Sequence, residues 1–567
     1  MPDLLTAPPA PAEDALPSLT PLAVAVTAAT LLSACGGGGG GSSGDPGPGS
    51  VPAASPTPPP PPPPTDAEAA RFLAQAGFAA LPADIATVKA NGYAAWLDAQ
   101  LAMPVSDGHA DWMVARGYAV EANRNSFAGL DNTLWRKFMS APDTLRQRVV
   151  LALSEIFVVS MAGLAVQWRG LMGAAYVDLL EQHAFGNYRA LLEAVTLSPA
   201  MGVYLAMRGN QKEDPRTGRV PDENYAREVM QLFTIGLVQL NADGTAKTGS
   251  DGKPLETYSQ SQITDLARVF TGWDYDGASG TDPAYVRKPM VNNPARFATG
   301  AKRVLSVDIP ATADGAAAMK TALDTLANHA NVGPFLCRQL IQRLVTSHPS
   351  PAYVARMAAV WADNGSGVRG DLKAVIRAML LDTEARTVPT GPSGGKLREP
   401  VQRLLQWGRS FGAASPTGVW NIGDTSNPAT RLGQSPLRSP SVFNFFRPGY
   451  VPPGSTLGTN AVTAPEFQLC NESTVAGYLN FLQTAIASGI GEVKASYTAE
   501  LAQATDAPAL VATLALRLGG GGISAPTEST VATAIATINA GTDAGKLNRV
   551  QAAILMLMAC PEYLVQK

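Results

Sequence analysis

Apolar residues recur at helical spacing from residue 65 to the end of the chain, and few segments alternate as strands do. Ala69, Phe72, Leu73 and Ala76 follow the i, i+3, i+4, i+7 spacing of a helix that buries one face. The same spacing predicts helices at 144–160, 176–195 (interrupted near Gly186), 221–236, 315–328, 334–346, 352–364, 372–381, 399–411, 473–488 and 546–558. The pattern therefore predicts a mainly α fold, a large multi-helix globular body that forms a single domain over residues 66–567.

Two stretches of this body lack the helical pattern. Residues 237–258 combine short apolar runs with an Asn-Ala-Asp-Gly turn, which predicts a small hairpin or extended insertion. Residues 412–470 are rich in Pro, Gly, Ser and Asn and are expected to form a long irregular segment. Such long loops in compact proteins are usually functional or wrap over the surface.

The first 65 residues have a different composition. Residues 21–34 form an apolar run that is too short to span a bilayer and suits the core of a signal peptide. The run ends in Leu-Ser-Ala before Cys35, which resembles the cleavage site of bacterial lipoproteins, although residues 2–34 contain no Lys or Arg. We therefore expect a lipoprotein-type signal peptide over 1–34 and lipidation of Cys35. Residues 35–65 are almost entirely Gly, Ser, Pro and Ala, which predicts a disordered tether.

This leader predicts where the protein acts. The chain is expected to be exported and held at the bacterial cell envelope by the lipid on Cys35, so the membrane is its first partner. Gly36 follows the cysteine, and by resemblance to Gram-negative sorting rules this favours the outer membrane.

Composition and known motifs exclude several classes of function. The 567 residues carry 43 basic and 46 acidic side chains, a net charge of −3, so we expect no binding to nucleic acid. No HExxH or GxxxxGK[ST] motif and no CxxC pair occurs, and the GxSxG matches at 40–44 and 391–395 lie in Gly-, Ser- and Pro-rich stretches that do not fit a nucleophile elbow. The sequence predicts neither a cofactor nor a metal. The four histidines are interpreted as structural, although His183 with Asp178 or Glu181 would be a metal site if distant residues met.

The helix predicted at 221–236 carries one polar stripe on an otherwise apolar surface. Asn224, Arg227, Glu228 and Gln231 share this stripe, and Glu223 is spaced to pair with Arg227. In one interpretation Glu228 is an acid, base or ligand and Arg227 holds an anionic group. In the other, the charges form a buried network that fixes the register of the helix.

Two further Arg/Glu pairs lie in apolar surroundings. Arg148 and Glu155 are seven residues apart on one face of the helix at 144–160. Arg398 and Glu399 precede Pro400 at the start of another helix. Because unpaired buried charges are costly, we hypothesise that these pairs converge with Arg227 and Glu228 on one polar centre.

Several segments, taken in order, resemble the bacterial Domain of Unknown Function 1800 family. They are Leu145-Arg-Gln-Arg-Val149 with Glu155, Ala184-Phe-Gly-Asn187, Pro221-Asp-Glu-Asn-Tyr-Ala-Arg-Glu228, Leu232-Phe-Thr-Ile-Gly236, Phe270-Thr-Gly-Trp273, Gly395-Lys-Leu-Arg-Glu-Pro400, Ser441-Val-Phe-Asn-Phe-Phe446, Ala464-Pro-Glu-Phe467 and Cys560-Pro-Glu-Tyr563. The resemblance spans residues 66–566. It implies export and an exported partner protein that looks like sulfatases and alkaline phosphatases, and it implies no catalytic residues.

Two functions remain open from the sequence. The first is an accessory or binding protein for an envelope partner or polymer. The second is an exported enzyme, such as a hydrolase, that uses the Arg and Glu groups on buried helices. A concave pocket lined by Asn224, Arg227 and Glu228 would favour the enzyme, whereas closed ion pairs would favour the binding protein.

Overall fold

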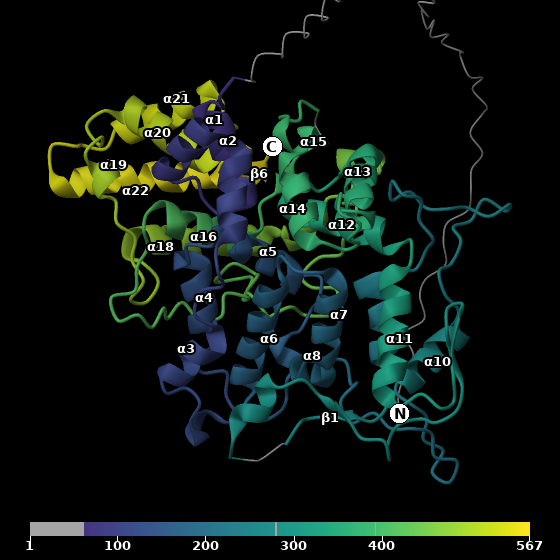
Figure 1. Cartoon of the computed structure of the whole chain (residues 1–567). Helices are drawn as coiled ribbons and strands as arrows, with labels where there is room; N and C mark the ends of the chain where they lie inside the picture. Colours follow the sequence, from purple (N-terminus) through teal and green to yellow (C-terminus); the bar gives the residue numbers. More distant parts are fainter. Residues whose placement is uncertain (1–61, 278–280, 392) are drawn as a thin grey trace, which may run out of the picture. The chain divides into compact units, whose positions relative to one another are not determined.

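The computed structural model describes residues 62–567 except 278–280 and 392, and the expected signal peptide, Cys35 and most of the tether lie outside this range. The body is mainly α-helical, as predicted (Figure 1). In its first half the helices are α1 Asp66–Ala76, α2 Pro82–Ala102, α3 His109–Ala115, α4 Leu130–Ser140, α5 Thr144–Ser154, α6 Arg169–His183, α7 Tyr188–Leu197, α8 Pro199–Tyr204, α9 Asn224–Glu228 and α10 Gln260–Val269.

The second half continues the helical pattern. Its helices are α11 Gly315–Asn328, α12 Val332–Leu344, α13 Pro351–Ala362, α14 Leu372–Leu381, α15 Thr383–Arg386, α16 Pro400–Ser410, α17 Thr456–Thr459, α18 Glu472–Ser488, α19 Thr498–Leu501, α20 Ala507–Gly519, α21 Ala525–Ala536, α22 Asp543–Ala559 and α23 Pro561–Leu564. Short 3-10 turns lie at η1 Glu121–Asn123, η2 Met161–Gly163, η4 Pro283–Arg287 and η5 Pro465–Leu469. No helix in the described part of the chain is both long enough and apolar enough to cross a membrane.

Side chains at the helix ends explain several of these boundaries. Thr65 and Glu68 form a reciprocal capping box at the start of α1. At α10 the Gln262 side chain accepts a 2.8 Å hydrogen bond from the backbone N–H of Ser259. Asp143 stands at the start of α5, but its carboxylate faces Gln147 and Arg146 and caps no backbone N–H.

Helix α5 lies at the centre of the body. It packs against α1, α2, α4, α6 and α12, and every residue from Leu145 to Leu153 is buried. The sequence predicts this helix to residue 160, but it ends at Ser154. Backbone groups beyond that point bond elsewhere: Phe157 O accepts from Tyr176 Oη at 2.6 Å, and Met161 N–H donates to Leu437 O at 2.9 Å. These contacts replace further helical hydrogen bonds.

The segment predicted as one helix at 221–236 changes its geometry midway. Helix α9 passes directly into a π-helix, η3 Val229–Thr234, in which Ile235 N–H reaches back five residues to Met230 O at 3.0 Å. The wider turn changes the direction of the side chains that follow it. The regular spacing that predicted one stripe for Asn224, Arg227 and Gln231 therefore does not hold beyond Glu228.

Strands make up only a small part of the described structure. Three antiparallel pairs occur: β1 Trp273–Asp274 with β2 Val291–Asn292, β3 Lys302–Val304 with β4 Val307–Ile309, and β5 Lys396–Leu397 with β6 Val565–Gln566. The insertion at 237–258 is extended and is held by single bridges such as Val238 with Glu256. The segment 412–470 is irregular apart from α17 and η5, as predicted.

Candidate functional site: a buried charge network beside a cleft

Six charged side chains meet in the interior next to the end of α5. The cations are Arg148 on α5, Arg343 on α12 and Lys396 on β5; the carboxyl groups are Glu155, Glu399 and Glu466. All six are buried, with 6% or less of each side chain exposed. Such a group is stable only when its charges are paired and hydrogen-bonded.

Two of the three carboxylates are fully engaged. Lys396 Nζ lies 2.5 Å from Glu466 Oε1 and 3.2 Å from Glu399 Oε1. The other oxygen of Glu466 accepts a 2.7 Å bond from Ser347 Oγ, and that of Glu399 accepts one of 2.7 Å from Gln434 Nε2. Glu399 also stands at the N-cap of α16, where the helix dipole favours a negative charge.

Glu155 differs from these two. Its Oε2 is buried and has no hydrogen-bond partner, since Arg343 Nε lies 3.5 Å away and is not aligned to donate. Burial, followed by the negative charge of Glu399, raises the pKa of Glu155 well above its usual value. Burial works against ionisation of Glu399 as well, but Lys396 and a hydrogen bond from Glu155 hold its pKa at about 2. The two shifts have opposite directions, so the neutral form is favoured for Glu155 and the ionised form for Glu399.

Glu155 also lines a cleft of about 720 Å³. Its polar wall holds Gln231, Gln339, Arg343, Arg447 and Gln468. Its apolar wall is formed by Ile156, Leu232, Leu237, Phe335, Val442, Phe443, Pro448, Tyr450 and Val451. Gln339 Nε2 is buried and has no hydrogen-bond partner in the described part of the protein. A mostly apolar cleft with a few polar groups, some unpartnered, has the character of a ligand-binding site.

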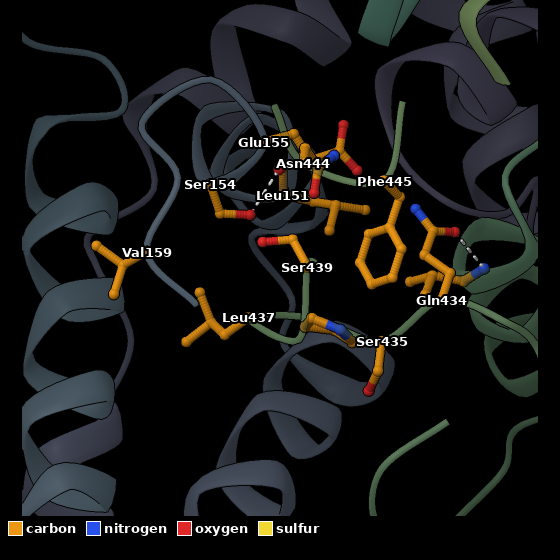
Figure 2. Close-up of a pocket in the computed structure, with 12 residues that line it drawn as sticks. Leu151, Ser154, Glu155, Val159, Gln434, Ser435, Leu437, Ser439, Asn444 and Phe445 are labelled. Atoms are coloured by element: carbon orange, nitrogen blue, oxygen red, sulfur yellow. Dashed lines mark hydrogen bonds between the residues drawn. The ribbon is translucent and has the colours of Figure 1, made fainter. Parts of the chain in front are cut away.

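A second, much smaller cavity adjoins Glu155 and is shown in Figure 2. Its volume is about 10 Å³, roughly the space that one water molecule needs. Ser439 Oγ and Asn444 Nδ2 line it and, like Glu155 Oε2, lack hydrogen-bond partners. Asn444 has a left-handed backbone (φ 61°), a conformation that costs energy for a residue other than glycine. The geometry provides the partners that a buried water requires.

The predicted convergence of six residues holds for half of them. Arg148, Glu155 and Glu399 meet in the network. Arg398 turns away: its guanidinium lies 4.5 Å from the centre of the Tyr563 ring and donates to Tyr563 O. The adjacent residues Arg398 and Glu399 at the start of α16 therefore have different neighbours: Glu399 faces the network, and Arg398 faces the C-terminal helix.

Arg227 does not join the network either. It is 41% exposed and pairs with Glu223 at 3.2 Å along α9, as the spacing of the two residues predicts. Asn224 is exposed on the first turn of the same helix. Asn224, Arg227 and Glu228 do not line the cleft beside Glu155; of the predicted stripe, Gln231 does.

Glu228 forms a separate polar group with two tyrosines. Burial raises its pKa, and Arg227 offsets part of that shift. Burial and the nearby Glu228 carboxyl raise the pKa of both Tyr204 and Tyr258 to about 12. Glu228 Oε2 and Tyr258 Oη are buried without hydrogen-bond partners. This group lies outside the cleft wall.

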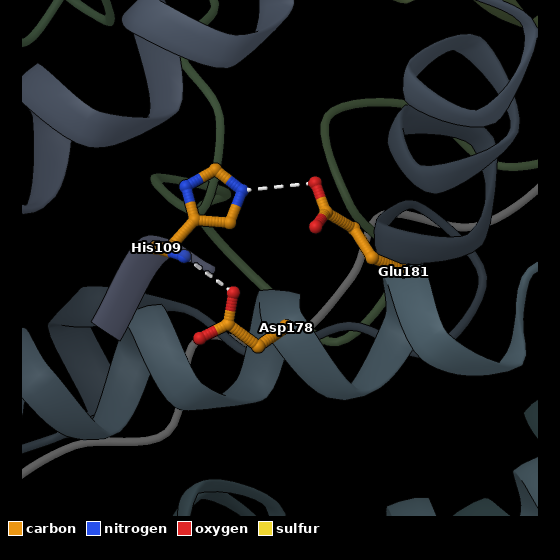
Figure 3. Close-up of side chains that lie close together, drawn as sticks. All are labelled: His109, Asp178 and Glu181. Carbon is orange, nitrogen blue, oxygen red and sulfur yellow. Dashed lines mark hydrogen bonds and ion pairs between the residues drawn. The ribbon is translucent and has the colours of Figure 1, made fainter. Parts of the chain in front are cut away.

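His109, Asp178 and Glu181 form the one cluster with metal-ligand character among the described residues (Figure 3). Their ligand atoms lie within 4.8 Å of one another, but each already has a protein partner. Asp178 accepts from the backbone N–H groups of His109 and Ala110 at 2.5 and 2.9 Å. Glu181 accepts from Lys137 and, at 2.9 Å, from Gln147. Because the Lys137 ammonium already neutralises Glu181, we interpret the cluster as structural.

His109 and His183 lie in different surroundings. His109 bonds Glu181 at 3.2 Å and Thr133 Oγ1 at 3.1 Å. His183, which the sequence allowed to approach Asp178 or Glu181, lines a different cavity of about 500 Å³ together with Asp178. His109, rather than His183, is the histidine that meets the two carboxylates.

Several residues of the site escaped the sequence interpretation. Lys396 and Glu466 lie within the segments Gly395–Pro400 and Ala464–Phe467 that carry the family resemblance, so their position was a usable signal. Arg343 and Gln339 lie on α12, whose apolar pattern gave no sign that two polar side chains turn toward a cleft.

The comparison with known families agrees with the resemblance. The family described as "Protein of unknown function (DUF1800)" matches residues 71–565. No curated protein and no solved structure matches the chain. Arg148, Glu155, Lys396, Glu399 and Glu466 of the charge network all lie within the range that this family matches. The chain therefore belongs to the DUF1800 family.

Proposed function

We propose that this protein is an exported envelope protein, anchored to the outer membrane through Cys35, whose helical body is a hydrolytic enzyme. The observation that carries the proposal is that Glu155, a buried residue whose carboxyl pKa is raised and whose Oε2 has no hydrogen-bond partner, lines a large cleft. Carboxylic acids that remain protonated near neutral pH are suited to give a proton to a substrate.

The proposed chemistry needs one substrate bond and one water molecule. Glu155 donates its proton to the leaving oxygen of the substrate as that bond breaks. It then takes a proton from the water whose oxygen joins the other fragment, which restores the acid. Glu399 stays ionised behind it and keeps the proton on Glu155 between turnovers, and the Arg343 guanidinium stabilises negative charge that develops in the cleft.

A binding protein without catalysis is the second candidate. The closed pairs around Lys396, Glu399 and Glu466 favour it, because they have the character of a network that holds helices in register. In that case the cleft would hold an envelope polymer, or would contact an exported partner protein similar to sulfatases and alkaline phosphatases. Nucleic acid is not among the partners proposed, since the net charge of −3 gives no attraction to it.

Substituting Glu155 distinguishes the two candidates. The full-length protein is incubated with an envelope extract of a Gram-negative bacterium, and newly formed products are measured by mass spectrometry. The enzyme proposal expects products from the wild type, at least a hundredfold less from Glu155→Gln, and unchanged products from Glu256→Gln, an exposed control. Equal product from Glu155→Gln, or none from the wild type, would contradict the proposal.

A further inference from the structure

The cleft beside Glu155 has an excess of positive charge. The charged side chains that line it are Glu155, Arg343 and Arg447. Arg447 is exposed, and no carboxylate in the described part of the chain lies within ion-pair distance of it. Behind the wall, Arg148 and Lys396 lie opposite Glu399 and Glu466, so the excess of positive charge comes from the two arginines of the wall itself. An anionic group is therefore the charge that this cleft accepts.

The uncharged part of the wall combines aromatic rings with side-chain amides. Phe335, Phe443 and Tyr450 supply the rings, and the Arg447 guanidinium lies 4.6 Å from the centre of the Phe443 ring. Gln231 and the buried Gln339 supply amides on the same wall. Sugar rings present C–H groups that stack on aromatic faces and hydroxyl groups that bond amides.

The Gln231 amide separates a sugar from a plain acyl chain. Gln231 lines the cleft and is only partly buried, so a sugar hydroxyl can bond its amide, whereas an alkyl chain would cover the amide without replacing its hydrogen bonds to water. The cleft volume of about 720 Å³ falls within the range typical of small-molecule sites, about 300–1,000 Å³.

We propose that this cleft binds a segment of an acidic polysaccharide, with a uronic acid carboxylate held between Arg343 and Arg447. The inference rests on the proposed function in so far as Glu155 would act on the bound chain. It adds the substrate class: a polyanion of sugar units, of the kind found in bacterial envelopes and capsules.

Binding of defined oligosaccharides tests this inference directly. The full-length protein in a mild non-ionic detergent is titrated calorimetrically with hexagalacturonate, neutral cellohexaose or octanoate. We expect hexagalacturonate to bind at least tenfold more tightly than cellohexaose or octanoate, and its affinity to fall as salt is added. Equal binding of cellohexaose, tighter binding of octanoate, or no binding of hexagalacturonate would overturn the inference.

Two arginine variants locate the binding site. Arg447→Ala should weaken hexagalacturonate binding at least fivefold, because it removes an exposed cation from the cleft wall. Arg116→Ala is the matched control: Arg116 is also exposed and lies over an aromatic ring, that of Trp112, but outside the cleft. An equal loss in both variants, or no loss in Arg447→Ala, would contradict the assignment.

The binding assay and the product assay can fail independently. Glu155→Gln should bind hexagalacturonate within about twofold of the wild type, because the amide keeps the shape and charge of the neutral acid. Binding without any product from the wild type would remove the enzyme proposal and leave the ligand class intact. Product that depends on Glu155, with no binding of hexagalacturonate, would remove the ligand class and leave the enzyme proposal intact.

Discussion

Replacing Lys396 with methionine tests the buried charge network, because the change removes one charge and nearly preserves the shape of the side chain. Lys396 Nζ lies 2.5 Å from Glu466 Oε1 and 3.2 Å from Glu399 Oε1, and the side chain is fully buried. At an effective dielectric constant of ~20, these distances correspond to roughly 7 and 5 kcal/mol of gross Coulomb attraction.

Most of that attraction is offset by the loss of water around the three groups. What remains measurable is the cost of leaving two carboxylates buried without their shared cation, about 3–5 kcal/mol for a buried pair. We therefore expect Lys396→Met to lower the free energy of unfolding by about 3–5 kcal/mol at neutral pH. Adding Glu466→Gln should restore part of this loss, because it removes one of the two unpaired charges.

Urea unfolding followed by helical circular dichroism measures the effect. Lys320→Met is the matched control: Lys320 pairs with Asp324 at 2.6 Å on α11, but its side chain is 73% exposed. A surface pair of this kind contributes about 0–1 kcal/mol. If Lys396→Met and Lys320→Met unfold within about 1 kcal/mol of each other, the reasoning about the network is refuted.

Four further predictions concern Glu155, Glu181, the His109 cluster and Cys35. Glu155→Gln should be more stable than the wild type at neutral pH, because the raised pKa of Glu155 makes the wild type lose stability as the pH rises above 4.5. A wild type that is more stable than Glu155→Gln at neutral pH would contradict this prediction. Glu181 has its pKa lowered to about 2 against the effect of burial, so its contribution is present above 4.5 and is lost as pH falls toward 2; urea midpoints of Glu181→Gln should lack this loss, and parallel curves would disprove it. EDTA should leave the melting temperature unchanged, because Lys137 already pairs with Glu181; a decrease reversed by Zn²⁺ would show that the cluster holds a metal. Cys35→Ser should abolish incorporation of labelled palmitate, and persistent labelling would exclude Cys35 as the lipid site.

The charge network also shows how far sequence patterns reach. Arg148 and Glu155 could be placed in one interior because they stand seven residues apart on an apolar helix, and the structure confirms this. Glu399 was predicted to join them, but its neighbour Arg398 was predicted to join as well and does not. The spacing of two residues on one helix predicts whether their side chains share a face. Residues that precede a helix have no such fixed relation, so the adjacent side chains of Arg398 and Glu399 can point to different neighbours.

The prediction of one regular helix at 221–236 was wrong for a related reason. Its residues follow an ideal helical stripe, but six of them form a π-helix, and Gln231 lines the cleft whereas Arg227 does not. Periodicity assumes 3.6 residues per turn, and a change of turn type leaves no trace in the order of polar and apolar residues. The helix at 144–160 was likewise predicted too long, because the contacts that end it come from Tyr176 and Leu437.

Local periodicity, composition and short motifs were enough to predict the mainly α character of the body, the positions of most long helices, the irregular segment at 412–470 and the family. Which charges meet depends instead on how distant segments pack. Arg343, Lys396 and Glu466 come from positions up to 123 residues apart, and their contacts depend on how α12, β5 and η5 pack around the end of α5. The cleft was decided in the same way, since the free energy of pairing a buried charge depends on groups that no local pattern brings together.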